Sequence, residues 1–252
     1  MTAKASLQAV IWDYDCTLAD TWQKNLVVTR NILEYLTGRD ARQIPALRSL
    51  DTYRTAVTRK NNWRQFYREE CGLTEAQTDL AGRSWTTFQM QDNTPIRFFE
   101  GIPEVLAALR PLPQGIVSQN SQRQIAKALR DSGLLPYFEK IVGYEEVAFD
   151  RQKPAPDALL LCIEHLIDSA SGEVWYIGDH DVDATCVFHA NRRLRDQGSE
   201  MRVRSMRACY GCDHDTAAWT IQPDYTVHTP RDILQIIHSS RQLSSYKGQQ
   251  EG

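Results

Sequence analysis

Short apolar runs that end in polar residues alternate with helical patterns along the chain after residue 94. The same kind of run opens the chain at residues 7–15, LQAVIWDYD, where it predicts a buried strand. Alternating strands and helices predict an α/β fold with a mostly parallel sheet and helices on both of its faces. The later strands are predicted within 114–121, 139–147, 173–181, 201–209 and 224–240, and the helices within 101–110, 122–134, 156–167, 183–194 and the end of 224–240.

Residues 22–94 differ from the rest because helical spacing and many charges continue there without a strand pattern. Several helices are therefore predicted in this stretch. Residues 242–252, QLSSYKGQQEG, are polar, and a frayed, disordered tail is predicted for them.

The composition of the 252 residues is that of a globular protein, with 42% apolar and 24% charged residues. The net charge of −3 gives no basic footprint for nucleic acid, and the basic run NRRLR at 191–195 is interpreted as a solvated helix face or loop. No apolar run approaches the roughly 18 residues that span a bilayer, and no signal-peptide pattern opens the sequence. Neither a nucleic-acid nor a membrane partner is therefore expected, and a cytoplasmic location is the default prediction.

The six cysteines are scattered along the chain, which favours free thiols in a reducing compartment. Cys209 and Cys212 form a C-x-x-C pair with His214 close behind, so a structural zinc site is an alternative. Such a site normally needs a second pair of ligands at matching spacing, and the sequence offers none. Buried or incidental thiols are therefore favoured.

Polar side chains follow three of the predicted strands at the point where each strand ends. Ligands of open parallel sheets bind outside the carboxyl ends of the strands, so these groups meet in one crevice if the strands are neighbours. The groups are Asp13 and Asp15, Ser118 and Asn120, and Asp179, Asp181 and Asp183.

Several carboxylates in one crevice need a compensating cation, since two unit charges about 4 Å apart repel by roughly 4 kcal/mol at an effective dielectric of about 20. Oxygen ligands without a cluster of His or Cys indicate a hard cation, and Mg²⁺ is predicted. A carboxylate beside Mg²⁺ is able to attack phosphorus and give an aspartyl-phosphate, while a second acid protonates the leaving alcohol and later activates water. Ser118 would hydrogen-bond the phosphoryl oxygens, and Lys153 would neutralise charge on the phosphoryl group and the nucleophile.

Four stretches of the chain resemble, in order, the four motifs of the haloacid dehalogenase (HAD) superfamily. The likeness is to its phosphoglycolate-phosphatase and β-phosphoglucomutase-type branch, and it extends from about Leu7 to Ile237. It implies a Rossmann-like parallel sheet core at residues 1–20 and 95–241, with an inserted helical C1 cap at residues 21–94. The four stretches are DYDCTLADT at 13–21, IVSQNS at 116–121, KPAPDALL at 153–160 and YIGDHDVD at 176–183.

The resemblance implies a role for each matching residue. Asp13 matches the nucleophile, and Asp15 matches the general acid/base that also gives a backbone carbonyl to Mg²⁺. Lys153 matches the lysine of the third motif. The implied phosphate-binding residues are Thr17, Ser118, Gln119, Asn120 and Lys153, and the implied metal ligands are Asp13, Asp15, Asp179 and Asp183.

The sequence departs from the family pattern at two places. Cys16 stands where the family usually has Gly. Gly adopts backbone conformations that are unfavourable for other residues, so the conformation of this loop is expected to be slightly altered. Enzymatic activity is still expected. The segment after the fourth motif, NRRLRDQGSEMRVRSM at 191–206, is longer than expected and is interpreted as a mark of a subfamily.

The motifs also bear on alternative functions. A haloacid dehalogenase lacks an acid at the position of Asp15, and a phosphonatase would need an activated lysine, which nothing near Lys60 indicates. A phosphomutase of the same superfamily stays open, and a non-hydrolytic phosphate-binding or regulatory module is disfavoured because Asp13, Lys153 and Asp179 are all present. The prediction is a Mg²⁺-dependent phosphatase for a small phosphorylated metabolite, acting as a monomer or homodimer.

Other residues near the motifs have a structural role as the alternative. Asp20 either faces the substrate or caps a helix, and Asn120 either contacts phosphate or caps the next helix. His180 is interpreted as a hydrogen-bonding group behind the carboxylates. Aromatic residues of the 22–94 segment, such as Trp63, Phe66, Tyr67 and Trp85, occur at near-helical spacings. Most of them are expected in the core of this segment, and one or two are expected to line the substrate pocket.

Overall fold

The computed structural model of the protein describes residues 6–60, 62–211 and 219–248, with only the backbone given from residue 240 onward. The chain forms two compact units. One consists of Met1–Asp20 together with Phe98–Gly252, and the other of Thr21–Arg97. Within the described residues, no helix is both long enough and apolar enough to cross a membrane.

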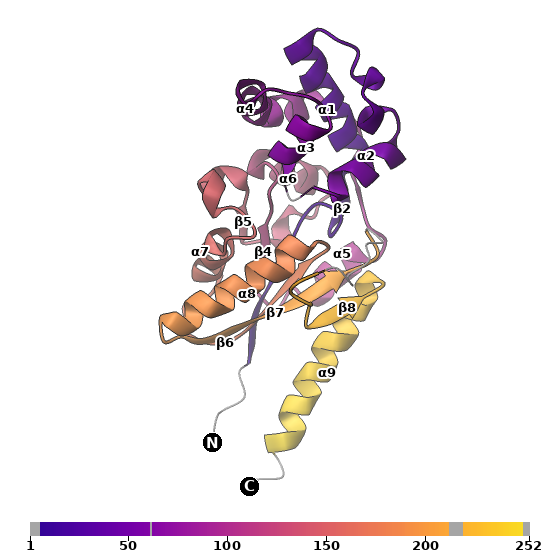
Figure 1. Ribbon diagram of the computed structural model, residues 1–252. Coiled ribbons are helices and arrows are strands. Elements are labelled where there is room, and N and C mark those ends of the chain that lie inside the picture. The colour runs from indigo at the N-terminus through magenta and orange to yellow at the C-terminus, as the bar shows by residue number, and fades with distance from the viewer. Residues whose placement is uncertain (1–5, 61, 212–218, 249–252) are drawn as a thin grey trace. The chain divides into compact units, whose positions relative to one another are not determined.

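The first unit contains a six-stranded sheet in which every pair of neighbouring strands is parallel (Figure 1). Its strands are β1 (Leu7–Trp12), β4 (Gln114–Val117), β5 (Lys140–Val142), β6 (Ser171–Gly178), β7 (Glu200–Ala208) and β8 (Tyr225–Val227). Their order is β5-β4-β1-β6-β7-β8, so β1 lies between β4 and β6. The predicted α/β fold with a parallel sheet is confirmed.

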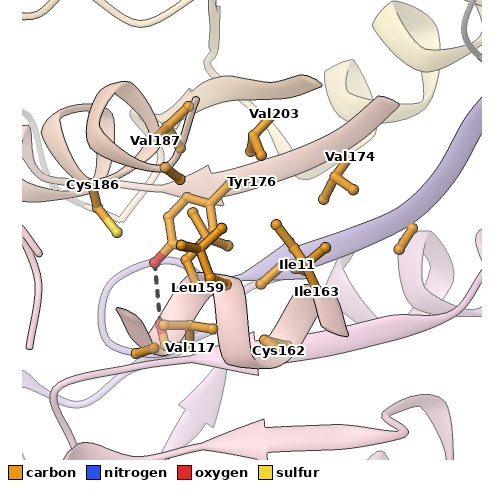
Figure 2. Packing of buried hydrophobic residues seen from close by; sticks show 14 of the residues in the cluster. Ile11, Val117, Leu159, Cys162, Ile163, Val174, Tyr176, Cys186, Val187 and Val203 are labelled. Atoms are coloured by element: carbon orange, nitrogen blue, oxygen red, sulfur yellow. Dashed lines mark hydrogen bonds between the residues drawn. The ribbon is translucent and has the colours of Figure 1, made fainter. Parts of the chain in front are cut away.

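Helices accompany the sheet on both faces. On one face, α7 and α8 pack over an apolar cluster that includes Ile11, Val174 and Val203 (Figure 2). On the other face, Gln114 Nε2 donates to the carbonyl oxygen of Leu106 in α5, and α5 contacts α9. These helices are α5 (Ile102–Ala108), α6 (Gln122–Asp131), α7 (Asp157–Leu166), α8 (Asp181–Asp196) and α9 (Pro230–Gly248).

The central strand β1 is covered on both faces. Its residues Ala9, Val10, Ile11 and Trp12 have no exposed surface, although successive side chains of a strand point to opposite faces. Continuous apolar runs are typical of parallel strands that helices cover on both sides, which explains why β1 is visible in the sequence as an unbroken apolar run.

Two predicted elements differ in extent. Within 139–147 only Lys140–Val142 is a strand, and Tyr144–Glu146 is a 3-10 helix whose Tyr144 N–H donates to the carbonyl oxygen of Asn120. Helix α9 continues to Gly248, through most of the segment for which the sequence predicts a frayed tail. Ile233 and Ile237 are fully buried and anchor this helix, and an anchored helix adds one hydrogen bond for each further residue.

The second unit is built from helices, as the sequence predicts for residues 22–94. Two of its helices begin at capping boxes, formed by Ser49 with Thr52 and by Thr74 with Gln77. The helices are α1 (Trp22–Thr37), α2 (Leu50–Thr58), α3 (Trp63–Glu69) and α4 (Glu75–Gln91). The short strands β2 (Ala19–Asp20) and β3 (Arg97–Phe98), where the chain passes from one unit to the other, pair with each other.

The four aromatic residues singled out in this helical unit divide between buried and partly exposed positions. Phe66 and Tyr67 are each 4% exposed, whereas Trp63 and Trp85 are partly exposed. Lys60, the lysine considered for the phosphonatase alternative, forms ion pairs with Glu69 and Glu70 at 2.9 and 2.7 Å. These pairs raise the pKa of Lys60, which argues against a neutral amine nucleophile at this position.

Candidate active site

The polar residues predicted at strand ends lie at the same edge of the sheet. Trp12 at the end of β1 is in register with Ile116 of β4 and with Ile177 of β6. The side chains that follow these positions are therefore neighbours, because parallel strands end at one edge. Asp13 follows β1, Ser118 follows β4, and Asp179 follows β6.

A buried lysine joins two of the predicted carboxylates. Lys153 Nζ lies 2.7 Å from Asp13 Oδ1 and 2.7 Å from Asp183 Oδ1. All three residues are at most 7% exposed, so water screens these charges little. Lys153 comes from the loop before α7 and Asp183 from the first turn of α8, so three separate segments of the first unit meet here.

Burial and neighbouring charges set the protonation of this group. Burial raises the pKa of Asp13 to about 7, an effect that Lys153 opposes and that the charges of Asp183 and Asp15 increase. For Lys153, burial disfavours the charged form, but Asp13 and Asp183 outweigh it and hold the pKa well above its ordinary value. The lysine is therefore a fixed positive charge beside the carboxylate of Asp13.

Asp179 completes a group of carboxylates that fits a divalent cation. One oxygen each of Asp13, Asp179 and Asp183 lies within 4.8 Å of the others, and all three residues are buried. Three buried carboxylates with one lysine leave an excess of negative charge, and the donors are all hard oxygens. Among the described residues, these three carboxylates form a cluster that is close enough together to hold a metal ion, and they fit the predicted Mg²⁺.

The carboxylate of Asp15 contacts a different set of groups from that of Asp13. Asn120 Nδ2 donates to both carboxylate oxygens of Asp15 at 3.0 Å, and Ser118 Oγ donates to Oδ2 at 3.4 Å. Ser118 Oγ also accepts the Asn120 N–H at 3.1 Å, so the turn after β4 is braced internally. Asn120, for which phosphate contact and helix capping are the predicted alternatives, thus also orients Asp15.

Thr17 and Gln119, two of the predicted phosphate-binding residues, also contact other residues of the site. Thr17 Oγ1 lies 3.5 Å from Asp179 Oδ1, at the outer limit of a hydrogen bond. Gln119 Nε2 donates to the backbone carbonyl of Lys153 at 3.0 Å, which ties the lysine segment to the turn after β4. The structure therefore brings the predicted site residues together around Asp13 and Asp15.

Residues beside the motifs have structural contacts of their own. His180 is the N-cap of α8, and Asp183 Oδ2 accepts its backbone N–H at 3.0 Å. Asp20 is exposed. Of the alternative zinc ligands, Cys209 is half-buried, and Cys212 and His214 lie outside the described residues.

Tyr176 belongs to the site and is not indicated by the sequence motifs. Its hydroxyl is buried in β6, where it donates to the carbonyl oxygen of Val117 at 3.1 Å (Figure 2). The same oxygen lies 3.1 Å from Lys153 Nζ and 3.1 Å from Asp183 Oδ1. The Tyr176 hydroxyl thus contacts both members of the Lys153–Asp183 ion pair and helps to hold them in place. Its only trace in the sequence is a tyrosine within an apolar strand, which core packing explains equally well.

Solved structures with the same fold come from several bacteria. A provisionally named phosphoglycolate phosphatase from Lactobacillus plantarum has a TM-score of 0.71 and 20% identity, over 91% of this chain and 99% of that one. A provisionally assigned HAD-like hydrolase from Bacteroides fragilis has a TM-score of 0.69 and 23% identity, over 89% and 98%. The magnesium-bound HAD-hydrolase YfnB from Bacillus subtilis, also provisionally assigned, has a TM-score of 0.61 and 17% identity, over 92% and 99%. No curated protein matches the sequence.

These structures define the fold, and the sequence itself defines the family. The model of the haloacid dehalogenase-like hydrolases matches residues 10–194, which include the ends of β1, β4 and β6 and the loop with Lys153. The chain therefore belongs to the HAD-like hydrolases. The resemblance stated from the four motifs is confirmed.

Proposed function

We propose that this hydrolase cleaves a small phosphomonoester in a Mg²⁺-dependent reaction with an aspartyl-phosphate intermediate on Asp13. The observation that carries the proposal is the different surroundings of two carboxylates one residue apart. Asp13 is buried against Lys153 and Asp183, whereas Asp15 is held by Asn120 and Ser118. Carboxylates in unlike environments are suited to unlike roles, one as nucleophile and the other as acid and base.

In the first step, Asp13 attacks phosphorus and the bond to the leaving alcohol oxygen breaks. Asp13 Oδ1 is engaged by Lys153, so we assign the attack to Oδ2. Asp15 delivers a proton to the leaving oxygen, and its own carboxylate is then ready to accept a proton from water. In the second step this water attacks phosphorus, inorganic phosphate leaves, and the carboxylate of Asp13 is regenerated.

The phosphoryl oxygens are assigned to the polar groups around the two acids. Ser118 supplies a hydroxyl, Lys153 a fixed positive charge, and Thr17 lies in the turn after Asp13. Asn120 and Gln119 hold Asp15 and the Lys153 segment, so part of their effect is positional.

Asp13, Asp179 and Asp183 are the side chains that would hold Mg²⁺, together with the backbone carbonyl of Asp15 as the family resemblance implies. The cation would neutralise the negative charge that gathers on the phosphoryl group. Lys153 contributes from within the protein by keeping its charge beside Asp13 and Asp183.

Residues 21–97 are proposed as the cap that selects the leaving group. Small soluble phosphomonoesters are favoured for an enzyme whose cap closes over the site and excludes water. Phosphoglycolate is the first compound to test, because one similar structure carries that provisional name.

The test is release of inorganic phosphate from a panel of small phosphomonoesters, with Mg²⁺ or with EDTA. We expect metal-dependent release by the wild type and its loss in Asp13→Asn. The matched control is Asp131→Asn, since Asp131 is an exposed acid paired with Lys127 on α6, and this variant should keep full activity. An isomerised phosphoester in place of free phosphate would indicate a phosphomutase, and no turnover of any panel member would contradict the proposal.

A further inference from the structure

The turn that carries Asp13 and Asp15 contains a residue in a disfavoured backbone conformation. Cys16 has a φ of 59°, and it is the one non-glycine residue with positive φ in the described part of the chain. A Cβ atom disfavours this left-handed region, so contacts must hold the turn there. Within the turn, Cys16 N–H donates to the Ala19 carbonyl at 2.9 Å, and the N–H groups of Leu18 and Ala19 donate to the Tyr14 carbonyl at 3.1 Å.

A second segment of the same unit, Tyr210–Gly211 after β7, packs against this turn from outside. Tyr210 Oη donates to the carbonyl oxygen of Thr17 at 3.0 Å. A Cβ atom on Gly211 would collide with the carbonyl oxygen of Cys16, so the backbone of Gly211 lies directly against that carbonyl. Tyr210–Gly211 therefore covers two successive carbonyl groups of the turn, those of Cys16 and Thr17.

Tyr210 is itself held in position. Its ring contacts the ring of Phe99 edge to face, with centroids 5.5 Å apart, and Phe99 N–H donates to the carbonyl oxygen of Leu18 at 3.1 Å. Burial, and after it the charge of Asp179, raise the pKa of the Tyr210 phenol. The hydroxyl therefore stays protonated and acts as a donor to Thr17.

We propose that Tyr210 is a positioning residue that holds the turn after Asp13 in the conformation required for phosphoryl binding, with Gly211 as the close-packed residue beside it. Peptide units are planar, so fixing the carbonyls of Cys16 and Thr17 also fixes the directions of the N–H groups of Thr17 and Leu18. The Leu18 N–H is used within the turn, which leaves the Thr17 N–H to be aimed at a phosphoryl oxygen. Tyr210 thereby compensates for a cysteine where the family usually has glycine; its effect on turnover rests on the proposed function.

The kinetic test is a double-mutant cycle between Tyr210→Phe and Cys16→Gly, with 4-nitrophenyl phosphate and Mg²⁺. Tyr210→Phe is expected to lower kcat/KM about tenfold, as the loss of one hydrogen bond would, and to weaken inhibition by inorganic phosphate. In the Cys16→Gly background, where glycine adopts the turn freely, the same change should cost about threefold or less. Equal losses in both backgrounds would mean a merely structural tyrosine and would overturn the proposal.

A second readout does not depend on turnover. Amide hydrogen exchange in peptides covering residues 13–20 is expected to be about tenfold faster in Tyr210→Phe than in the wild type. The matched control is Tyr225→Phe, because the Tyr225 ring stacks on Trp175 elsewhere on the sheet, and it should leave this exchange unchanged. Unchanged exchange in Tyr210→Phe would overturn the proposal. Faster exchange in a protein without phosphatase activity would support Tyr210 as the residue that holds the turn and count against the proposed function alone.

Discussion

Asp13 and Asp15 show how one turn separates two chemically identical side chains. The Asp13 carboxylate is buried beside Lys153 and Asp183, and the Asp15 carboxylate accepts hydrogen bonds from Asn120 and Ser118. Holding Asp13 ionised in this place is unfavourable for the fold because burial disfavours its charge more than Lys153 favours it. A function that needs the charge there therefore reduces stability.

Asp13→Asn is expected to stabilise the protein in EDTA, and to do so more at about pH 8 than at about pH 5. The pKa of Asp13 rises from 3.8 to about 7 on folding. The folded state therefore binds this proton more tightly than the unfolded state does. The stabilisation that the protonated Asp13 gives the folded state is lost as the pH rises through about 7. Urea unfolding of both proteins at both pH values measures the effect, with Asp131→Asn as a surface control. An Asp13→Asn protein whose advantage shrinks at the higher pH would contradict this reasoning.

Asn120→Ala is expected to lower kcat by about 10- to 100-fold with little change in KM, because Asp15 loses the amide that holds both of its oxygens. Asn191 offers a matched control, since its side-chain amide also makes two hydrogen bonds, but these join α8 to the N–H and carbonyl groups of Val203 in β7. Asn191→Ala should reduce the free energy of unfolding and leave kcat unchanged. Steady-state kinetics and urea unfolding of both variants separate the two effects, and an unchanged kcat in Asn120→Ala would argue against its orienting role.

The residues that bear charge were the most predictable from the sequence. Asp13 and Asp179 are recognisable because each directly follows an apolar strand run, and Lys153 is recognisable from the KPAPDALL stretch that resembles the third family motif. The interaction of Asn120 with Asp15 could not be predicted from the sequence. The direction of the Asn120 side chain depends on the turn after β4, and distant segments of the chain set the geometry of that turn. Tyr176 could not be read either, because in the sequence a tyrosine in an apolar run is equally suited to core packing.

At the scale of elements, the junction between β6 and α8 depends on a close approach that only glycine allows. A Cβ atom on Gly178 would collide with the carboxylate of Asp183. Gly178→Ala should therefore displace Asp183 from Lys153 and lower phosphatase activity by at least about tenfold. Gly133→Ala is the control, because a Cβ there meets no atom within 4 Å although its φ of 71° disfavours alanine. Wild-type kcat/KM in Gly178→Ala would show that Asp183 can shift without consequence.

Element types were predictable, and element extents and neighbours were not. Buried parallel strands have continuous apolar runs, which reveal β1 and β6 in the sequence. The extent of β5 depends on Tyr144–Glu146, where the chain turns to bond Asn120, and the apolar pattern does not record this. Strand order is absent from the pattern as well, because it is decided by how each crossover helix packs.

For the whole molecule, the sequence indicates two regions of different construction, and the structure has two compact units with boundaries at Asp20 and Arg97. Helical spacing without strands is a strong signal over so long a segment, which is why residues 22–94 could be anticipated as helical. The leaving group could not be anticipated, because the shape of a pocket depends on side chains that no motif marks. The role of this unit as a cap is part of the proposed function.

Mg²⁺ is expected to raise the thermal unfolding temperature of the entire protein, because a cation that binds only the folded state stabilises it by mass action. The stabilisation is about 2.7 kcal/mol at a concentration of about 100 times Kd. It should be larger than an ordinary salt effect, since three buried carboxylates repel one another without the cation. Asp179→Asn should remove most of the shift and Asp131→Asn none of it, when unfolding is followed by circular dichroism with Mg²⁺ and then with EDTA. An equal shift in Asp179→Asn would mean that Mg²⁺ binds elsewhere, and the carboxylate group at the edge of the sheet would then need another explanation.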